Sequence, residues 1–145
     1  MSDIFADMNL ATISPDLAPV PDGQYNFRVL EASINEFPYK QDLPEKGVSA
    51  GDIGTYLKFG FVIFGDPEHA GRRIYQTIFP NNNVPRSLRI LMDATGVPQT
   101  ASLKEWLTDL STNKAEFTAS LFSRTDKRDG SVRPEVRLTT AQPVQ

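Results

Sequence analysis

The chain has 145 residues, 39% of them hydrophobic and 23% charged, which is an ordinary composition for one globular domain with a buried core. It has no cysteine and a single histidine, His69, which excludes a disulfide framework, a thiolate metal site and a multi-histidine metal site. No apolar run approaches the roughly 20 residues of a membrane helix, and the acidic start lacks the positive charge of a secretory signal. We therefore expect a soluble, cytoplasmic protein that uses neither a metal nor a cofactor.

The net charge of −3 is unevenly distributed along the chain. Residues 1–54 carry nine acidic and three basic side chains, a net of −6, so the remainder carries +3. A polyanion responds to the charge that lines a groove and not to the total charge of the protein. The asymmetry is therefore compatible with a nucleic-acid ligand, although variation in composition explains it equally well.

The N-terminal segment differs from the rest of the chain. Residues 1–22 contain Pro15, Pro19 and Pro21 with little periodicity, which predicts an extended arm. A single domain is expected over residues 23–145, beginning with a strand.

The first strand shows a change of parity. Its apolar residues alternate as far as Val29, and the alternation then continues one position out of step from Leu30, which indicates a bulge or strong coiling. Residues 35–54 are predicted to be a long connection. Within it, Phe37, Tyr39 and Lys40 are candidates for a mobile stacking element or, equally, for a cap over the end of the barrel.

Residues 55–79 are the centre of the fold, with two strand-like runs joined by a Gly- and Pro-containing turn. Period-2 alternation puts successive side chains on opposite faces, and one face is plainly apolar. The other face carries aromatic and basic side chains, an unusual set for a surface that merely meets water. They are Tyr56, Lys58, Arg73 and Tyr75, with Arg72 next to them.

Two helices are predicted after this pair of strands. The first spans residues 84–95 and ends at Gly96. The second spans residues 102–110, with Ser102 as its N-terminal cap. Trp106 falls among leucines at helical spacing, which places it in the core rather than on a base-stacking surface.

Two further strands, residues 114–124 and 133–141, are expected to form a hairpin that turns at Asp129 and Gly130. Phe122 falls on the face of the first strand opposite to its core residues. The hairpin region carries five basic residues against three acidic ones, and such loops are often only solvated; the basic residues are Arg124, Lys127, Arg128, Arg133 and Arg137.

The order of elements predicts a mainly β fold, namely a five-stranded Greek-key OB-fold barrel with helices between strands three and four. A β-sandwich is the alternative, but it has no natural place for the helices. Ligands of OB-folds bind the outer face of strands two and three and the loops that join strands 1–2 and 4–5. The candidate nucleic-acid-binding residues converge on that surface: Tyr39, Lys40, Tyr56, Lys58, Arg72, Arg73, Tyr75, Phe122, Arg124, Lys127, Arg128, Arg133 and Arg137.

Aromatic and basic residues on one surface suit a single strand of nucleic acid. An unpaired base stacks on an aromatic ring for about 1–3 kcal/mol whatever the base, and Lys and Arg contact the phosphates. A duplex hides its base faces, so the rings select single strands. Two structural roles stay open for the same side chains: Tyr56 and Tyr75 lie under the N-terminal arm, or Lys58 and Arg73 form a solvated cross-strand pair.

Four segments, spread over residues 22–142, resemble the phage-encoded OB-fold single-stranded-DNA-binding proteins. They read DGQYNFRVLEA, GTYLKFGFVIFGDPEHAGRRIY, SLRILMDATGV and EFTASLFSRTDKRDG. The resemblance implies nonspecific binding of single-stranded DNA, with RNA as a second possibility, in phage DNA replication and recombination in the host cytoplasm. It also implies no catalysis, with phage or host replication and recombination proteins as candidate partners. A homo-oligomer, paired or arrayed along the DNA, is compatible with the footprint of one OB barrel, about 4–16 nucleotides.

The C-terminus departs from this family. The chain ends TTAQPVQ and has no acidic residue after Glu135, so recruitment of partners by an acidic tail is not expected. The acidic N-terminal segment is a candidate substitute, either by competing for the DNA groove or by meeting partners.

Two further classes of function are an enzyme and a structural module. An enzyme finds little support because the sequence has no Gly-rich phosphate loop and no nucleophile elbow, and no catalytic residue is predicted. The stronger alternative is a small β-barrel structural or adaptor module, in a virion or an interaction complex, that does not bind nucleic acid. Such a module does not need Tyr and Lys or Arg interleaved on strands two and three.

Overall fold

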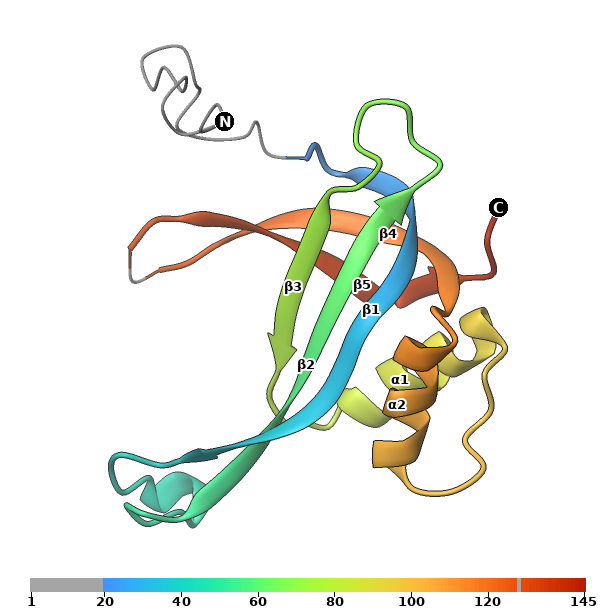
Figure 1. The fold of residues 1–145 in the computed structure, drawn as a ribbon. Helices are drawn as coiled ribbons and strands as arrows, with labels where there is room; N and C mark the ends of the chain where they lie inside the picture. Colours follow the sequence, from blue (N-terminus) through green and yellow to red (C-terminus); the bar gives the residue numbers. More distant parts are fainter. Residues whose placement is uncertain (1–19, 128) are drawn as a thin grey trace, which may run out of the picture.

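A computed structural model describes residues 20–127 and 129–145. The predicted arm therefore lies almost wholly, and Arg128 entirely, outside the described residues. The fold is mainly β, with one five-stranded antiparallel sheet and two α-helices (Figure 1). The elements are β1 (Gly23–Pro38), a 3-10 helix η2 (Pro44–Lys46), β2 (Ile53–Phe64), β3 (Arg73–Ile78), α1 (Val84–Thr95), α2 (Leu103–Thr112), β4 (Glu116–Thr125) and β5 (Val132–Gln142).

The strand order in the sheet is β3-β2-β1-β4-β5. Both α-helices follow β3 along the chain, as the sequence predicts. Helix α1 contacts β4 and β5, and α2 contacts β1. Within the described ranges, neither helix is long and apolar enough to cross a membrane.

The core is built on the apolar face predicted for the central strands. On β2, Phe59 and Phe61 are fully buried, and their rings stack at 5.5 Å between centroids. The Phe61 ring meets Phe117 of β4 edge-on at 5.4 Å and Phe27 of β1 at 6.1 Å. Because such aromatic pairs add about 0.5–1.5 kcal/mol to the burial of their area, this cluster fixes the three strands against one another.

The change of parity predicted in the first strand is confirmed. The register of β1 against β2 shifts between Val29 and Glu31, so Val29 and Ala32 both face the core. Leu30, at the bulge, is 37% exposed. The bend lets residues 23–28 of β1 pair with β4 while residues 26–38 pair with β2.

The predicted connection over residues 35–54 is wrong at both ends. Strand β1 continues to Pro38 and β2 begins at Ile53, so only residues 39–52 connect them. Gly54, a turn signal in the sequence, is a strand residue that makes room for aromatic rings. A Cβ there would lie 2.7 Å from the rings of Phe37 and Tyr39.

The helices follow their sequence signals. Gly96 ends α1 with φ 74°, and its N–H donates to the Met92 carbonyl at 3.0 Å. The Ser102 hydroxyl accepts a 3.2 Å hydrogen bond from the backbone N–H of Glu105. Trp106 is 2% exposed and donates from Nε1 to the Val97 carbonyl, which confirms it as a core residue.

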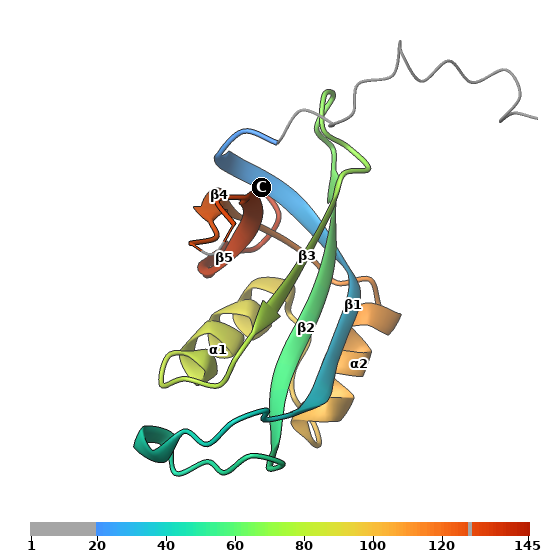
Figure 2. The same ribbon diagram turned by 90° about the vertical axis from the view of Figure 1, so that its left-hand side faces the viewer.

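Two hairpins extend from the sheet on the side away from the helices (Figure 1). We call them the β1–β2 arm, residues 35–56, and the β4–β5 arm, residues 122–135. Seen from that side, β3 and β2 run between the two arms (Figure 2). The predicted binding surface is therefore the region that the two arms flank.

Candidate nucleic-acid interface

A groove of about 620 Å³ separates the β2–β3 face from the β4–β5 arm. Residues distant in the sequence form it, from β2, from β3 and from the β4–β5 arm. They are Lys58, Tyr75, Gln76, Thr77, Arg124, Thr125, Asp126, Lys127, Arg133, Pro134 and Glu135. The structure thus brings together five residues predicted from the sequence: Lys58, Tyr75, Arg124, Lys127 and Arg133.

The charge of the groove is positive, because its lining has four basic and two acidic side chains. Lys58 Nζ lies 3.6 Å from Glu31 Oε1, and Arg124 Nη1 lies 3.5 Å from Glu135 Oε2. All four residues have part of their side chain in solvent, and exposed pairs of this kind contribute only about 0–1 kcal/mol. An incoming phosphate therefore competes readily for either cation.

Tyr75 presents an aromatic ring to this groove. It is 52% exposed and lies opposite Gly60 in the β2–β3 register. A Cβ on Gly60 would lie 2.7 Å from the ring, so the ring rests directly on the β2 backbone. A ring supported from below in this way offers a stacking surface that loses little rotamer freedom when a base binds.

A second group of rings lies at the base of the β1–β2 arm, and we call it the aromatic cluster: Phe37, Tyr39, Tyr56 and Phe79. The centroids of Phe37 and Tyr39 are 4.7 Å apart, and those of Tyr56 and Phe79 are 5.7 Å apart. Phe79 is 54% exposed, so the cluster keeps an open face. Phe79 also continues the outward parity of Arg73, Tyr75 and Thr77.

The sequence analysis names three members of this cluster, Phe37, Tyr39 and Tyr56, and misses Phe79. Phe37 is expected in the connection, whereas the structure places it on β1, at the parity of Glu31 and Asn35. Phe79 falls at the predicted end of a strand, four residues after Tyr75. The sequence signal that could have identified Phe79 is its parity, which places it on the same outward face as Tyr75.

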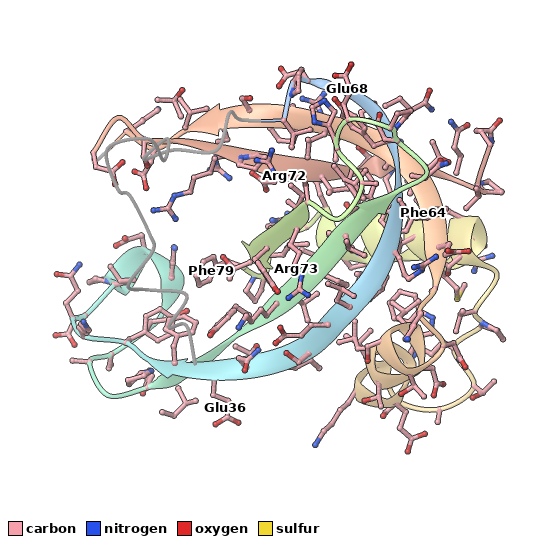
Figure 3. All side chains as sticks on the ribbon, turned by 45° about the horizontal axis from the view of Figure 1, so that its top comes forward. Glu36, Phe64, Glu68, Arg72, Arg73 and Phe79 are labelled. Carbon is pink, nitrogen blue, oxygen red and sulfur yellow. The ribbon has the colours of Figure 1, made fainter. Side chains whose placement is uncertain are left out.

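The remaining predicted residues lie around the groove and do not line it. Arg73, at the start of β3, lies over the β2–β3 face, and Phe79 of the aromatic cluster lies over the same face just past the other end of the strand (Figure 3). Glu36, which is not a predicted site residue, points outward from β1 (Figure 3). Arg72 precedes β3 and is half-buried, and Lys40 is exposed on the β1–β2 arm.

Phe122 and Arg137 lie together on β4 and β5. The Arg137 guanidinium lies 4.5 Å from the centroid of the Phe122 ring, a cation–π contact that covers one ring face. That face is therefore closed to a base unless Arg137 moves.

The solvated cross-strand pair of Lys58 and Arg73 does not form. Lys58 lies opposite Thr77, and Arg73 lies opposite Val62. Lys58 meets Glu31 of β1 instead. The alternative that the N-terminal arm covers Tyr56 and Tyr75 concerns residues outside the described ranges.

Gln76 is a site residue that the sequence analysis missed. It occupies a core-facing position of β3, at the same parity as Ile74, and is 9% exposed. Its side-chain Nε2 donates to the Val136 carbonyl at 3.1 Å, and its Oε1 accepts from the Val136 N–H at 2.7 Å. The sequence signal that could have identified Gln76 is its polar side chain at a position where the alternation calls for an apolar, core-facing residue.

Tyr25, near the start of β1, has a raised pKa, because burial disfavours the phenolate and the carboxylates of Asp66, Glu68 and Asp22 repel it. It does not line the groove. Across residues 20–127 and 129–145, no three His, Asp or Glu side chains come together in a way that suits a metal ion.

No protein-family model matches the chain, and none of the curated proteins is significantly similar to it.

Proposed function

We propose that the protein is an OB-fold that binds single-stranded DNA without sequence preference in the groove between the β2–β3 face and the β4–β5 arm. One observation carries the proposal: an exposed tyrosine and four cations, from strands far apart in the sequence, line the same groove. The strand order and the position of the helices after β3 support the OB-fold assignment.

The two kinds of side chain suit the two parts of a nucleotide. Tyr75 and the exposed Phe79 offer ring faces to unpaired bases, while Arg124, Lys127 and Arg133 offer donors and charge to phosphates. A duplex keeps its bases stacked and paired, so only the cations would engage it. Binding should therefore favour single strands and weaken as salt rises. The proposal involves binding alone, without catalysis.

The test is fluorescence anisotropy with labelled oligo-dT, the matching oligo-rU and a duplex of equal length, each titrated at low and moderate salt. We expect tight, salt-sensitive binding of oligo-dT and much weaker binding of the duplex. The titration with oligo-rU distinguishes a DNA-binding from an RNA-binding protein. Absence of binding to all three at low salt would overturn the proposal and favour the structural or adaptor module.

A role in phage replication or recombination follows from the family resemblance and extends this proposal. It requires that the protein act on single strands while other enzymes work on them. Stimulation or protection of a single-stranded substrate in a reconstituted strand-annealing reaction would support it.

A further inference from the structure

Strands β3 and β5 are the two ends of the strand order, and no backbone ladder joins them, although both lie wholly within the described residues. The Gln76 side chain makes the connection instead. Its amide offers one donor and one acceptor to the carbonyl and N–H of a single residue, Val136. This is the pairing that a backbone peptide group would make in a ladder.

The position of this connection relates it to the groove. Gln76 itself lines the groove, between Tyr75 and Thr77 on one side and Pro134 and Glu135 on the other. Val136 is buried and begins the part of β5 that packs on the core, immediately after the arm that carries Arg133. The hydrogen bonds between Gln76 and Val136 therefore lie where the two sides of the groove meet, namely the β2–β3 face and the β4–β5 arm.

We infer that Gln76 is a positioning residue, which by joining β3 to β5 fixes the distance between the Tyr75 ring and the basic side chains of the β4–β5 arm. The inference rests on the proposed function for its effect on binding. Without this connection, β5 is still held by β4, by α1 and by the core, but the hydrogen bonds that fix it to β3 are lost, and the cations of the arm lose their fixed placement relative to Tyr75. A strand that must contact both sides then binds to a less organised site.

The first variant is Gln76→Leu, which replaces the buried amide with an apolar side chain of similar size and removes both hydrogen bonds. We expect affinity for oligo-dT to fall roughly tenfold, because the two backbone groups of Val136 lose their partners and the arm shifts. The matched control is Trp106→Phe, which removes one buried hydrogen bond to the Val97 carbonyl in the helical layer. That control should change affinity by less than about twofold, since only stability is affected.

A second measurement does not depend on DNA. In the wild-type protein the Val136 amide should exchange slowly with solvent because it is buried and bonded to Gln76. In Gln76→Leu its exchange should accelerate about tenfold or more, while amides between β1 and β2 stay protected. Unchanged protection of Val136, or a loss of affinity no greater than that of Trp106→Phe, would overturn the inference.

Gln76→Glu keeps the test decisive if the leucine variant does not fold. A protonated carboxyl has one donor and one acceptor like the amide, whereas a carboxylate has only acceptors and repels the Val136 carbonyl. Relative to wild type, affinity and Val136 protection should therefore recover as the pH falls through the pKa of the introduced carboxyl. Burial and the groove's Asp126 and Glu135 raise that pKa, while Lys58, Arg124, Lys127 and Arg133 lower it.

Thr77→Glu is the control for charge, because Thr77 is an exposed neighbour that lines the same groove and pairs with Lys58 of β2. Its carboxylate should weaken binding without altering Val136 exchange at any pH. The same pH dependence of exchange in both glutamate variants would contradict the inference. If the wild-type protein bound no single strand, the proposed function would fail, and Val136 exchange would still decide whether Gln76 holds β5 to β3.

Discussion

The two arms that flank β3 are both hairpin extensions of the same sheet, yet their surfaces differ in chemistry. The β1–β2 arm, residues 35–56, carries four acidic against two basic residues and has three of the four rings of the aromatic cluster. The β4–β5 arm, residues 122–135, carries four basic against three acidic residues, and its one ring, Phe122, is covered by Arg137.

If the protein binds single strands as proposed, this difference assigns different interactions to the two arms. A nucleic-acid strand needs flat surfaces for bases and cations for phosphates, and each arm supplies mainly one of them. Lys58 and Tyr75, on the strands between the arms, combine both chemistries at the centre of the groove. We therefore expect mutations on the two arms to change different observables: the salt dependence on one side, and the salt-independent affinity on the other.

The largest effect should come from the β4–β5 arm. Replacing Arg124, Lys127 and Arg133 together with alanine should weaken binding of oligo-dT roughly 100-fold at low salt. The slope of log K against log salt should become shallower by about 2, since each single-strand phosphate contact contributes about 0.7. Anisotropy titrations at several salt concentrations measure both quantities.

The control for this variant lies on α1, which does not line the groove. Arg86→Ala with Arg89→Ala removes two exposed cations, and the Arg89–Asp93 pair there is an exposed i,i+4 contact. An equal change of slope in the α1 variant would mean that overall charge, and not the arm, drives binding.

Removal of the central ring should have the next largest effect. We expect Tyr75→Ala to weaken binding roughly tenfold at every salt concentration, because it removes one stacking surface and no charge. The salt slope should stay that of the wild-type protein. A shallower slope with unchanged low-salt affinity would show that the ring does not stack a base.

The glycine beneath the ring offers a second way to test the same surface. In Gly60→Ala the new Cβ would lie 2.7 Å from the Tyr75 ring and force it away from β2. The tyrosine is then still present but displaced, and affinity should fall by a few fold, less than in Tyr75→Ala. Gly54→Ala is the matched control, because its Cβ would displace Phe37 and Tyr39 on the β1–β2 arm instead. A larger loss of affinity in Gly54→Ala than in Gly60→Ala would move the main stacking surface from Tyr75 to the aromatic cluster.

Most of this fold could be predicted because its signals are local. Alternation through Phe59 and Phe61 predicted the core face, a change of parity at Leu30 predicted the bulge, and Gly96 ended α1 where it was expected. Each of these features depends on residues close in the chain, so periodicity and turn chemistry were sufficient to find it.

The features that escaped prediction depend on residues that meet only in the folded chain. Gln76 looks like an interruption in an apolar parity, and its role appears only when Val136, 60 residues later, lies beside it. Gly54 looks like part of a loop, because nothing local shows that two rings occupy the space of its missing Cβ. The groove has the same origin, since its lining comes from β2, β3 and the β4–β5 arm.

The smallest effect should come from Lys40, a predicted site residue on the aromatic side. Lys40 is exposed at the start of the β1–β2 connection and does not line the groove. Lys40→Ala should change affinity for oligo-dT by less than about twofold and leave the salt slope unchanged, because a solvated charge away from the phosphates contributes little. Lys127→Ala, an exposed lysine on the opposite arm, is the matched comparison and should reduce the slope by about 0.7. Equal slopes in the two single variants would show that phosphates run along both arms, and the division of binding between an aromatic and a basic side would then be wrong.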